Sequence, residues 1–274
     1  MNGNEFLDHI VQVGRRAATA AGAILQTNYE KPHDITLKSA IDPVTETDVA
    51  SQETIIRTIR EAFPDHGVLA EEVMEGGGPD GGEPPPPSPY RWIIDPLDGT
   101  VNFAHGFPMF CLSIAFEAEG RVEYGVVYDP LRQELFEATR GGGAFLNGRT
   151  LRVSRVTRLD AALVATGFPY DIRERLPQTL ARLQRVLAVA QGLRRAGSAA
   201  LDLAYLAAGR LDGFFEENLK PWDTAAGVLL VTEAGGRVST FAGSGYHLDS
   251  GDILASNGPL HHALRELVIG RAGG

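Results

Sequence analysis

Apolar residues recur at helical spacing near the start of the chain. This pattern predicts a long first helix that buries one face. A second amphipathic pattern predicts a helix over residues 48–63, which Pro64 ends. The apolar face of the first helix consists of Phe6, Ile10, Val13, Ala17, Ala20 and Ile24.

After the second helix the pattern changes to short apolar runs that are typical of strands. Residues 68–70 and 91–94 predict two short strands. Turn residues at Glu119-Gly120 and Asp129-Pro130 separate three longer runs, so we expect those runs to form an antiparallel meander. The three runs are residues 111–118, 122–128 and 134–138.

The second half of the chain alternates between strand and helix patterns. An antiparallel sheet followed by such alternation predicts a layered α/β fold. We expect one domain over residues 1–274, with an α+β part over about 1–150 and an α/β part over about 151–274. The predicted strands are 162–166, 213–215 and 253–255, and the predicted helices are 176–189, with Leu176, Leu180, Leu183 and Leu187 in register, 198–208, 223–234 and the segment from Pro259 onward.

Composition narrows the range of functions. The 274 residues are 43% hydrophobic and 22% charged, which is ordinary for a soluble globular protein. With 25 basic and 35 acidic residues, the net charge is −10, and an acidic surface repels nucleic-acid phosphates. No signal peptide or membrane-spanning apolar run is present in the sequence, so we expect a cytoplasmic protein without a membrane or nucleic-acid partner.

Two local features limit the chemistry further. Cys111 is the only cysteine, which excludes a disulfide within the chain and a cysteine-rich zinc site. Its apolar neighbours favour a buried small side chain. Residues 76–89 are mostly glycine and proline, so we expect an exposed loop there.

The densest chemical signal is the segment from Asp95 to Thr100. An apolar run leads into Asp95, and Pro96 is expected to stop strand pairing because it has no N–H to donate. Asp98 follows, and Gly99 allows a tight turn. Two carboxylates at about 4 Å repel by several kcal/mol, and a divalent cation reverses that sign. Oxygen ligands suit Mg²⁺, Mn²⁺ or Ca²⁺, although a plain turn is the alternative.

Other acids follow predicted elements in the same way. Glu71-Glu72 come after the strand at 68–70, and Asp223 precedes a predicted helix. Asp42 and Asp48 flank a short segment before the second helix. Each of these acids alone is explained by a solvated loop, a turn or a helix cap, so their combination carries the argument.

That combination resembles the inositol monophosphatase family over nearly the whole chain. The motifs that carry the resemblance are Glu71-Glu72, the segment from Asp95 to Phe103, the segment from Arg195 to Ala204, the segment from Trp222 to Gly227, and the segment from Thr232 to Gly236. The resemblance implies a layered αβαβα sandwich of the inositol monophosphatase and fructose-1,6-bisphosphatase type, usually a homodimer. It also implies two to three Mg²⁺ per subunit, with Mn²⁺ or Ca²⁺ able to substitute in binding.

The resemblance assigns roles to individual residues. Glu71, Asp95 and Thr100 would be catalytic, with Thr100 and Glu71 orienting the attacking water. Asp42 would serve a weaker third metal site or order the loop that carries Lys38. The metal ligands would be Glu71, Asp95, the Leu97 carbonyl, Asp98, Asp223 and Asp42, and the substrate-binding residues would be Asp98, Gly99, Thr100, Ser198, Ala199, Glu216 and Asp223. Glu217, beside Glu216, leaves the sugar-facing acid ambiguous.

The implied activity is hydrolysis of a small polyol or sugar phosphate, with myo-inositol monophosphate as the first candidate. Fructose 1,6-bisphosphate, histidinol phosphate and adenosine 3′,5′-bisphosphate are alternative substrates. A non-catalytic partner of the transcription machinery is the alternative of another class. Arg194-Arg195 fits either phosphate binding or a structural ion pair, and His261-His262 is expected at the surface.

Overall fold

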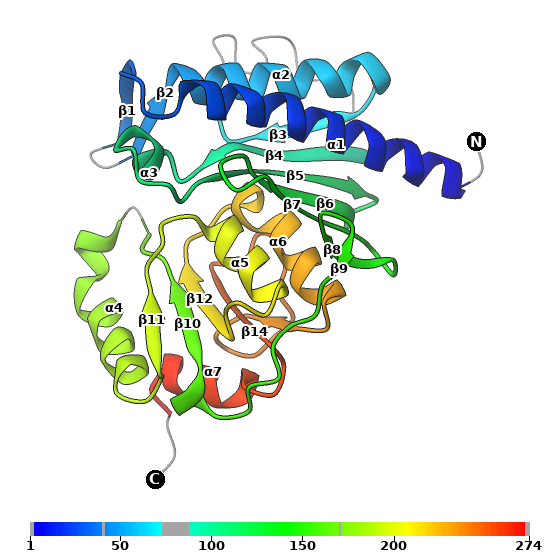
Figure 1. Ribbon diagram of the computed structural model, residues 1–274. Coiled ribbons are helices and arrows are strands. Elements are labelled where there is room, and N and C mark those ends of the chain that lie inside the picture. Colours follow the sequence, from blue (N-terminus) through cyan, green and yellow to red (C-terminus); the bar gives the residue numbers. More distant parts are fainter. Residues whose placement is uncertain (1–2, 40–41, 73–87, 170, 272–274) are drawn as a thin grey trace.

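The computed structural model describes residues 3–39, 42–72, 88–169 and 171–271. Figure 1 shows layers in the order helices, sheet, helices, sheet, helices. This order confirms the expected αβαβα sandwich. Most of the glycine- and proline-rich segment at 76–89 lies outside the described residues.

The first sheet has seven strands in the order β3-β4-β5-β6-β7-β8-β9. In this sheet β3 and β4 are parallel, and the other neighbouring strands are antiparallel. The predicted antiparallel meander is formed by β5, β6 and β7. It continues into β8 and β9, two strands that the sequence did not indicate. A separate β1–β2 hairpin was also not predicted. The strands are β1 (Ile35–Ser39), β2 (Asp42–Thr45), β3 (Gly67–Ala70), β4 (Tyr90–Asp98), β5 (Cys111–Ala118), β6 (Arg121–Asp129), β7 (Glu134–Thr139), β8 (Gly143–Leu146) and β9 (Arg149–Thr150).

Strand β4 corrects one expectation. Pro96 does not end the strand, because pairing with β5 is interrupted after Asp95 and resumes where Asp98 faces Cys111. Proline removes one donor from the ladder, and the strand passes this point through an irregularity in register. The two acids therefore belong to one strand end.

The second sheet has five strands in the order β11-β10-β12-β14-β13. Its β11, β10 and β12 are parallel, and β14 runs antiparallel to both β12 and β13. The strands are β10 (Leu163–Thr166), β11 (Gly192–Arg194), β12 (Gly213–Glu217), β13 (Arg237–Ser239) and β14 (Asp252–Ser256), and a 3₁₀ turn (Leu159–Ala161) precedes β10.

The helices bury their apolar faces in three separate cores. Helices α1 and α2 pack on the outer face of the first sheet, and α5 and α6 fill the space between the two sheets. Helices α4 and α7 cover the far face of the second sheet. The helices are α1 (Gly3–Asn28), α2 (Glu46–Ala62), α3 (Thr100–Ala104), α4 (Ile172–Leu187), α5 (Ala199–Ala207), α6 (Pro221–Glu233) and α7 (His261–Ile269).

Burial differs from expectation at two places. His261 is only 3% exposed, because its ring lies between the hydroxyls of Ser239 and Ser256; the prediction of a surface position was wrong. On α4, Leu176, Leu180 and Leu187 point into solvent instead of the core. Cys111 is buried, as predicted. Within the described residues, no helix has the length and apolar character needed to cross a membrane.

Candidate active site

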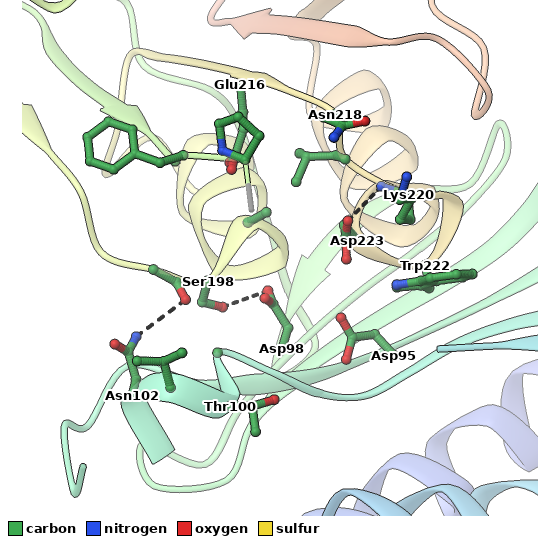
Figure 2. A pocket seen from close by; sticks show the side chains of 18 of the residues that line it. Asp95, Asp98, Thr100, Asn102, Ser198, Glu216, Asn218, Lys220, Trp222 and Asp223 are labelled. Atoms are coloured by element: carbon green, nitrogen blue, oxygen red, sulfur yellow. Dashed lines mark hydrogen bonds between the residues drawn. The ribbon is translucent and has the colours of Figure 1, made fainter. Parts of the chain in front are cut away.

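The acidic residues meet where the first sheet faces the middle layer of helices. Strands β3 and β4 are parallel, so their carboxyl ends lie side by side, and the Glu71 N–H donates to the Ile94 carbonyl at 3.1 Å. This pairing places Glu71 beside Asp95. Asp223 reaches the same place from the first turn of α6. Figure 2 shows Asp95, Asp98 and Asp223 converging on one pocket.

The pocket has a volume of about 460 Å³ and collects residues from both halves of the chain. The Asp42 side chain lies outside the described part of the structure, so its place near the site stays a prediction. The expected site residues that line the pocket are Glu71, Asp95, Leu97, Asp98, Gly99, Thr100, Ser198, Ala199, Glu216 and Asp223.

Asp98 is held by donors from the other half of the chain. Its Oδ2 accepts a hydrogen bond from the Ser198 hydroxyl and one from the Ala200 N–H, each at 2.7 Å. The Cys111 thiol adds a longer contact of 3.8 Å. Because Ser198 and Ala200 lie at the start of α5, this carboxylate ties the first sheet to the middle layer.

Asp95 and Asp223 are fixed by backbone N–H groups close in sequence. Asp95 Oδ1 accepts from the Leu97 N–H at 3.0 Å, within the irregular stretch of β4 between Asp95 and Asp98. Asp223 Oδ2 accepts from the Lys220 N–H at 2.6 Å at the start of α6. Lys220 is the N-cap of α6, and Asp223 is the third residue of the helix. The alternative interpretation of Asp223 as an N-cap is therefore wrong.

Asp48 lies next to the site, although the sequence alone indicated only a helix cap for it. The N-cap is Thr45, and Asp48 closes a capping box with it from inside α2. The other oxygen of Asp48 accepts a hydrogen bond from the Thr100 hydroxyl at 2.9 Å. The capping-box pattern was visible in the sequence, but only the fold shows that its acid reaches Thr100.

The two acids on β12 have different partners. Glu217 forms an ion pair with Arg182 of α4. Glu216 is 8% exposed and points into the pocket. This difference favours Glu216 over Glu217 as the acid that faces a ligand.

Burial and mutual repulsion raise the pKa values of the clustered acids. The pKa of Asp95 is raised well above its usual range by burial first, and then by the charges of Glu71, Asp98 and Asp223. Burial also raises the pKa of Asp223, with Glu71 as the next cause. The pKa of Asp98 rises through burial although Ser198 and nearby N–H groups oppose the rise. These shifts indicate that no positively charged side chain of the described residues offsets the burial and the mutual repulsion of these acids.

A divalent cation fits the chemistry of these donors. The set consists of carboxylates and the Leu97 carbonyl, which are the oxygen ligands that Mg²⁺ and Ca²⁺ prefer. Among the described residues, no lysine or arginine forms an ion pair with Asp95, Asp98 or Asp223.

The acids share a pocket but are not yet arranged as a finished coordination shell. Within the described part of the chain, no group of three or more histidine, cysteine, aspartate or glutamate side chains could hold a metal ion as it stands. Asp98 and Asp223 each have an oxygen committed to protein donors.

Comparison with known proteins agrees with this geometry. Residues 7–272 match the inositol monophosphatase family. The chain belongs to the inositol monophosphatase family. The match covers both sheets and all of the acids in the pocket, so the expected family and fold type are confirmed.

Individual members of the inositol monophosphatase family are similar over almost their full length. "Nus factor SuhB" of Pseudomonas aeruginosa is 46% identical over 261 residues, covering 93% of this chain and 94% of that protein. The crystal structure of extragenic suppressor protein suhB from Bartonella henselae has 41% identity and a TM-score of 0.87, covering 94% of this chain and 98% of that one. The inositol monophosphatase from Anabaena has 39% identity and a TM-score of 0.84, covering 96% of each chain.

Proposed function

We propose that this protein is a Mg²⁺-dependent phosphatase for a polyol or sugar phosphate, with myo-inositol monophosphate as the first substrate. The observation that carries the proposal is the convergence of Glu71, Asp95, Asp98 and Asp223 on one pocket. The resemblance to the Anabaena inositol monophosphatase supports the choice of substrate.

The proposed metal ligands are the pocket acids and one backbone oxygen. Glu71, Asp95 and the Leu97 carbonyl would hold one ion, and Asp95, Asp98 and Asp223 a second, with Asp42 near a weaker third. When bound, such ions neutralise a phosphate dianion and lower the pKa of water. The raised pKa values of the acids support this assignment, because a cation would relieve their repulsion.

Thr100 and Glu71 are assigned to the attacking water. The Thr100 hydroxyl donates its proton to Asp48, which leaves the lone pairs of Oγ1 able to accept a hydrogen bond from water. The Glu71 carboxylate would accept the proton that the water loses. Asp48 is then a positioning residue, because it fixes the direction in which the Thr100 hydroxyl points.

The substrate would lie between the turn at Gly99 and the start of α5. Gly99 has φ of 97°, a left-handed conformation that aims the backbone of Gly99 and Thr100 into the pocket. We assign the phosphate to the N–H groups of these two residues. Ser198, Ala199 and Glu216 would face the alcohol part.

Replacing Asp95 with asparagine tests the function. Asp95→Asn keeps the size of the side chain and removes charge from both proposed ion sites. We expect inositol monophosphate hydrolysis to fall by at least about 10³-fold, a loss of about 4 kcal/mol of transition-state stabilisation. Mg²⁺ should raise the melting temperature of the wild type and not that of the variant. Hydrolysis by Asp95→Asn at the wild-type rate would contradict the proposal.

We also propose a homodimer that covers the exposed leucines of α4. Leu176, Leu180 and Leu187 follow one another along one side of the helix and are 46%, 52% and 58% exposed. Leucines at this spacing suit packing against a second helix. The dimer agrees with the family expectation stated from the sequence.

A partner role in transcription is the second candidate function. It is favoured by the names of relatives, since the proteins from Pseudomonas aeruginosa and Escherichia coli with 46% identity are each called "Nus factor SuhB". Such a role could accompany catalysis, and the expectation of no nucleic-acid partner stays a prediction. A pull-down with the transcription machinery that gives equal recovery of wild type and Asp95→Asn would separate this role from hydrolysis.

A further inference from the structure

A second polar group faces the pocket away from the acid cluster. Arg195 lies between β11 and α5 and lines the pocket. Its guanidinium carbon is 5.1 Å from the centre of the Phe168 ring, which follows β10. A guanidinium stacked on an aromatic face keeps its N–H groups free along its edge.

Arg195 is close to two acids without being bonded to them. No ion pair joins it to a carboxylate of any described residue, so the structural ion pair considered from the sequence is absent in this part of the chain. Burial raises the pKa of Glu216 to about 8, Asp202 adds to the rise, and the charge of Arg195 opposes it. A donor and an acceptor therefore share this end of the pocket with space between them.

Two glycines make room for this donor and this acceptor. A Cβ atom at Gly167 would lie 2.1 Å from the Glu216 carboxylate oxygens. A Cβ atom at Gly197 would lie 2.6 Å from Arg195 Nη1. A side chain at Gly167 would displace the buried Glu216 carboxylate, and one at Gly197, where φ is 89°, would be strained and would also shift the Arg195 guanidinium.

We propose that Arg195, supported by Phe168, is a specificity-determining residue that donates to one substrate hydroxyl while Glu216 accepts from the adjacent hydroxyl. The inference rests on the proposed function and adds the group that recognises the alcohol part. A pair of neighbouring hydroxyls on a polyol ring offers one acceptor and one donor, which matches a guanidinium and a carboxylate. An aryl phosphate without hydroxyls offers neither.

The charges around Arg195 disfavour a second phosphate at this end. Burial raises the pKa values of Glu216 and Asp202, which both lie within electrostatic reach of Arg195, so Arg195 is the one cation among these three groups. A phosphate dianion would meet one cation and two acids. The enzyme should therefore prefer a polyol with one phosphate over a bisphosphate.

The test compares Arg195→Met with Arg194→Met. Methionine keeps apolar contact with Phe168 and removes the donors. Arg194 is the matched control, because it is exposed and its Nη1 bonds only the neighbouring Leu193 carbonyl among the contacts described. Calorimetry with myo-inositol 1-phosphate and Ca²⁺ should show about tenfold weaker binding to Arg195→Met, and unchanged binding to Arg194→Met.

Kinetics with two substrates identify the group that Arg195 contacts. For Arg195→Met, KM for myo-inositol 1-phosphate should rise about tenfold with kcat within about twofold, and KM for p-nitrophenyl phosphate should not change. An equal rise for both substrates would mean that Arg195 binds the phosphate and would overturn the proposal. Selective loss of fructose 1,6-bisphosphate hydrolysis would overturn it in favour of a second phosphate.

The two proposals fail in different ways. If the wild type hydrolyses none of these esters with Mg²⁺, the proposed function is wrong, and the calorimetric comparison still decides whether Arg195 recognises a polyol. If the wild type hydrolyses them and Arg195→Met binds myo-inositol 1-phosphate as tightly as the wild type, the inference about Arg195 is wrong alone.

Discussion

Thr100 has one hydroxyl proton and two nearby acceptors. Its Oγ1 is 2.9 Å from Asp48 Oδ1 and 3.0 Å from the Leu97 carbonyl oxygen. Donation to Asp48 leaves that carbonyl oxygen free for another partner, such as the proposed ion. The pKa of Asp48 is raised to about 6 by burial, and the hydrogen bonds from Thr45 and Thr100 limit the rise. The hydroxyl thus connects helix α2 to the site.

Thr100→Val tests this connection. Valine keeps the branched shape and removes the hydroxyl, so the proposed water loses an acceptor and Asp48 loses a donor. We expect kcat for inositol monophosphate to fall about 100-fold, and the free energy of unfolding to fall by about 2 kcal/mol, measured by urea denaturation. Thr100→Ser should retain most of both, and equal loss in the serine variant would point to packing instead.

His261 predicts a pH dependence of stability. Its pKa is lowered to about 4, by burial first and then by the charges of Arg237, Arg265 and His262. The unfolded chain takes up this proton below about pH 6.5, and the folded protein only below about 4. Between these values the unfolded state binds more protons, so stability falls as the pH falls.

The variant His261→Gln isolates this effect from that of the acids. Urea denaturation at pH 7 and pH 5 should show that the variant loses about 2 kcal/mol less than the wild type over this range. The exposed His247 provides the control, and His247→Gln should behave as the wild type does. If His261→Gln lost as much unfolding free energy between pH 7 and pH 5 as the wild type does, protonation of the buried ring would not be the cause of the loss.

At the residue scale, the sequence was a good guide to which acids share the pocket and a poor guide to the residues that surround them. Asp95, Asp98 and Asp223 lie in distinctive motifs, so their common pocket could be expected. Asp48 and His261 depend on contacts across the fold, namely with Thr100 and with two serines. No local pattern in the sequence distinguishes a paired buried histidine from an exposed one.

At the scale of elements, a close backbone approach joins β6 to α6. A Cβ atom at Gly125 would lie 2.8 Å from Ala226 Cα and 3.1 Å from Ala226 Cβ. Backbone atoms cannot move away as a flexible side chain can. The glycine therefore sets the distance between the first sheet and the middle helices, and α6 carries Asp223 into the site.

Gly125→Ala should separate these two elements. We expect a loss of about 2 kcal/mol in the free energy of unfolding, measured by urea denaturation, because the added methyl overpacks a close contact. Activity should also fall, since Asp223 moves with α6. Gly245→Ala is the matched control, because nothing lies within 4 Å of a Cβ atom there. Equal stability of the two variants would contradict this account of the contact.

Most helices and strands were predictable from apolar periodicity, but the side on which each packs against the rest of the chain was not. The first helix, the meander and the later β/α alternation follow from patterns of apolar residues. The short strands β8 and β9 were missed because two to four residues carry little periodic signal. The leucine row predicted helix α4, but periodicity alone does not say which face of a helix meets its own chain.

At the scale of the whole molecule, the exposed leucines of α4 predict a dimer. Leu180→Glu places a charge in the middle of the row, where a partner would have to bury it. We expect light scattering to show a change from twice 29.4 kDa to 29.4 kDa with unchanged circular dichroism. Gln178→Glu, about 200° away around the helix, is the control and should leave the mass unchanged. A wild type that is already monomeric would contradict the dimer.

The carboxylate of Asp98 is held by residues that come much later in the sequence. Its donors are supplied by Ser198 and Ala200, and Asp223 comes later still. A chain that is still leaving the ribosome at residue 190 would thus have made Glu71, Asp95 and Asp98, but neither the donors that hold Asp98 nor the fourth acid, Asp223. Hydrolytic competence must appear late in synthesis and all at once, and no partly made fragment should cleave esters in the meantime.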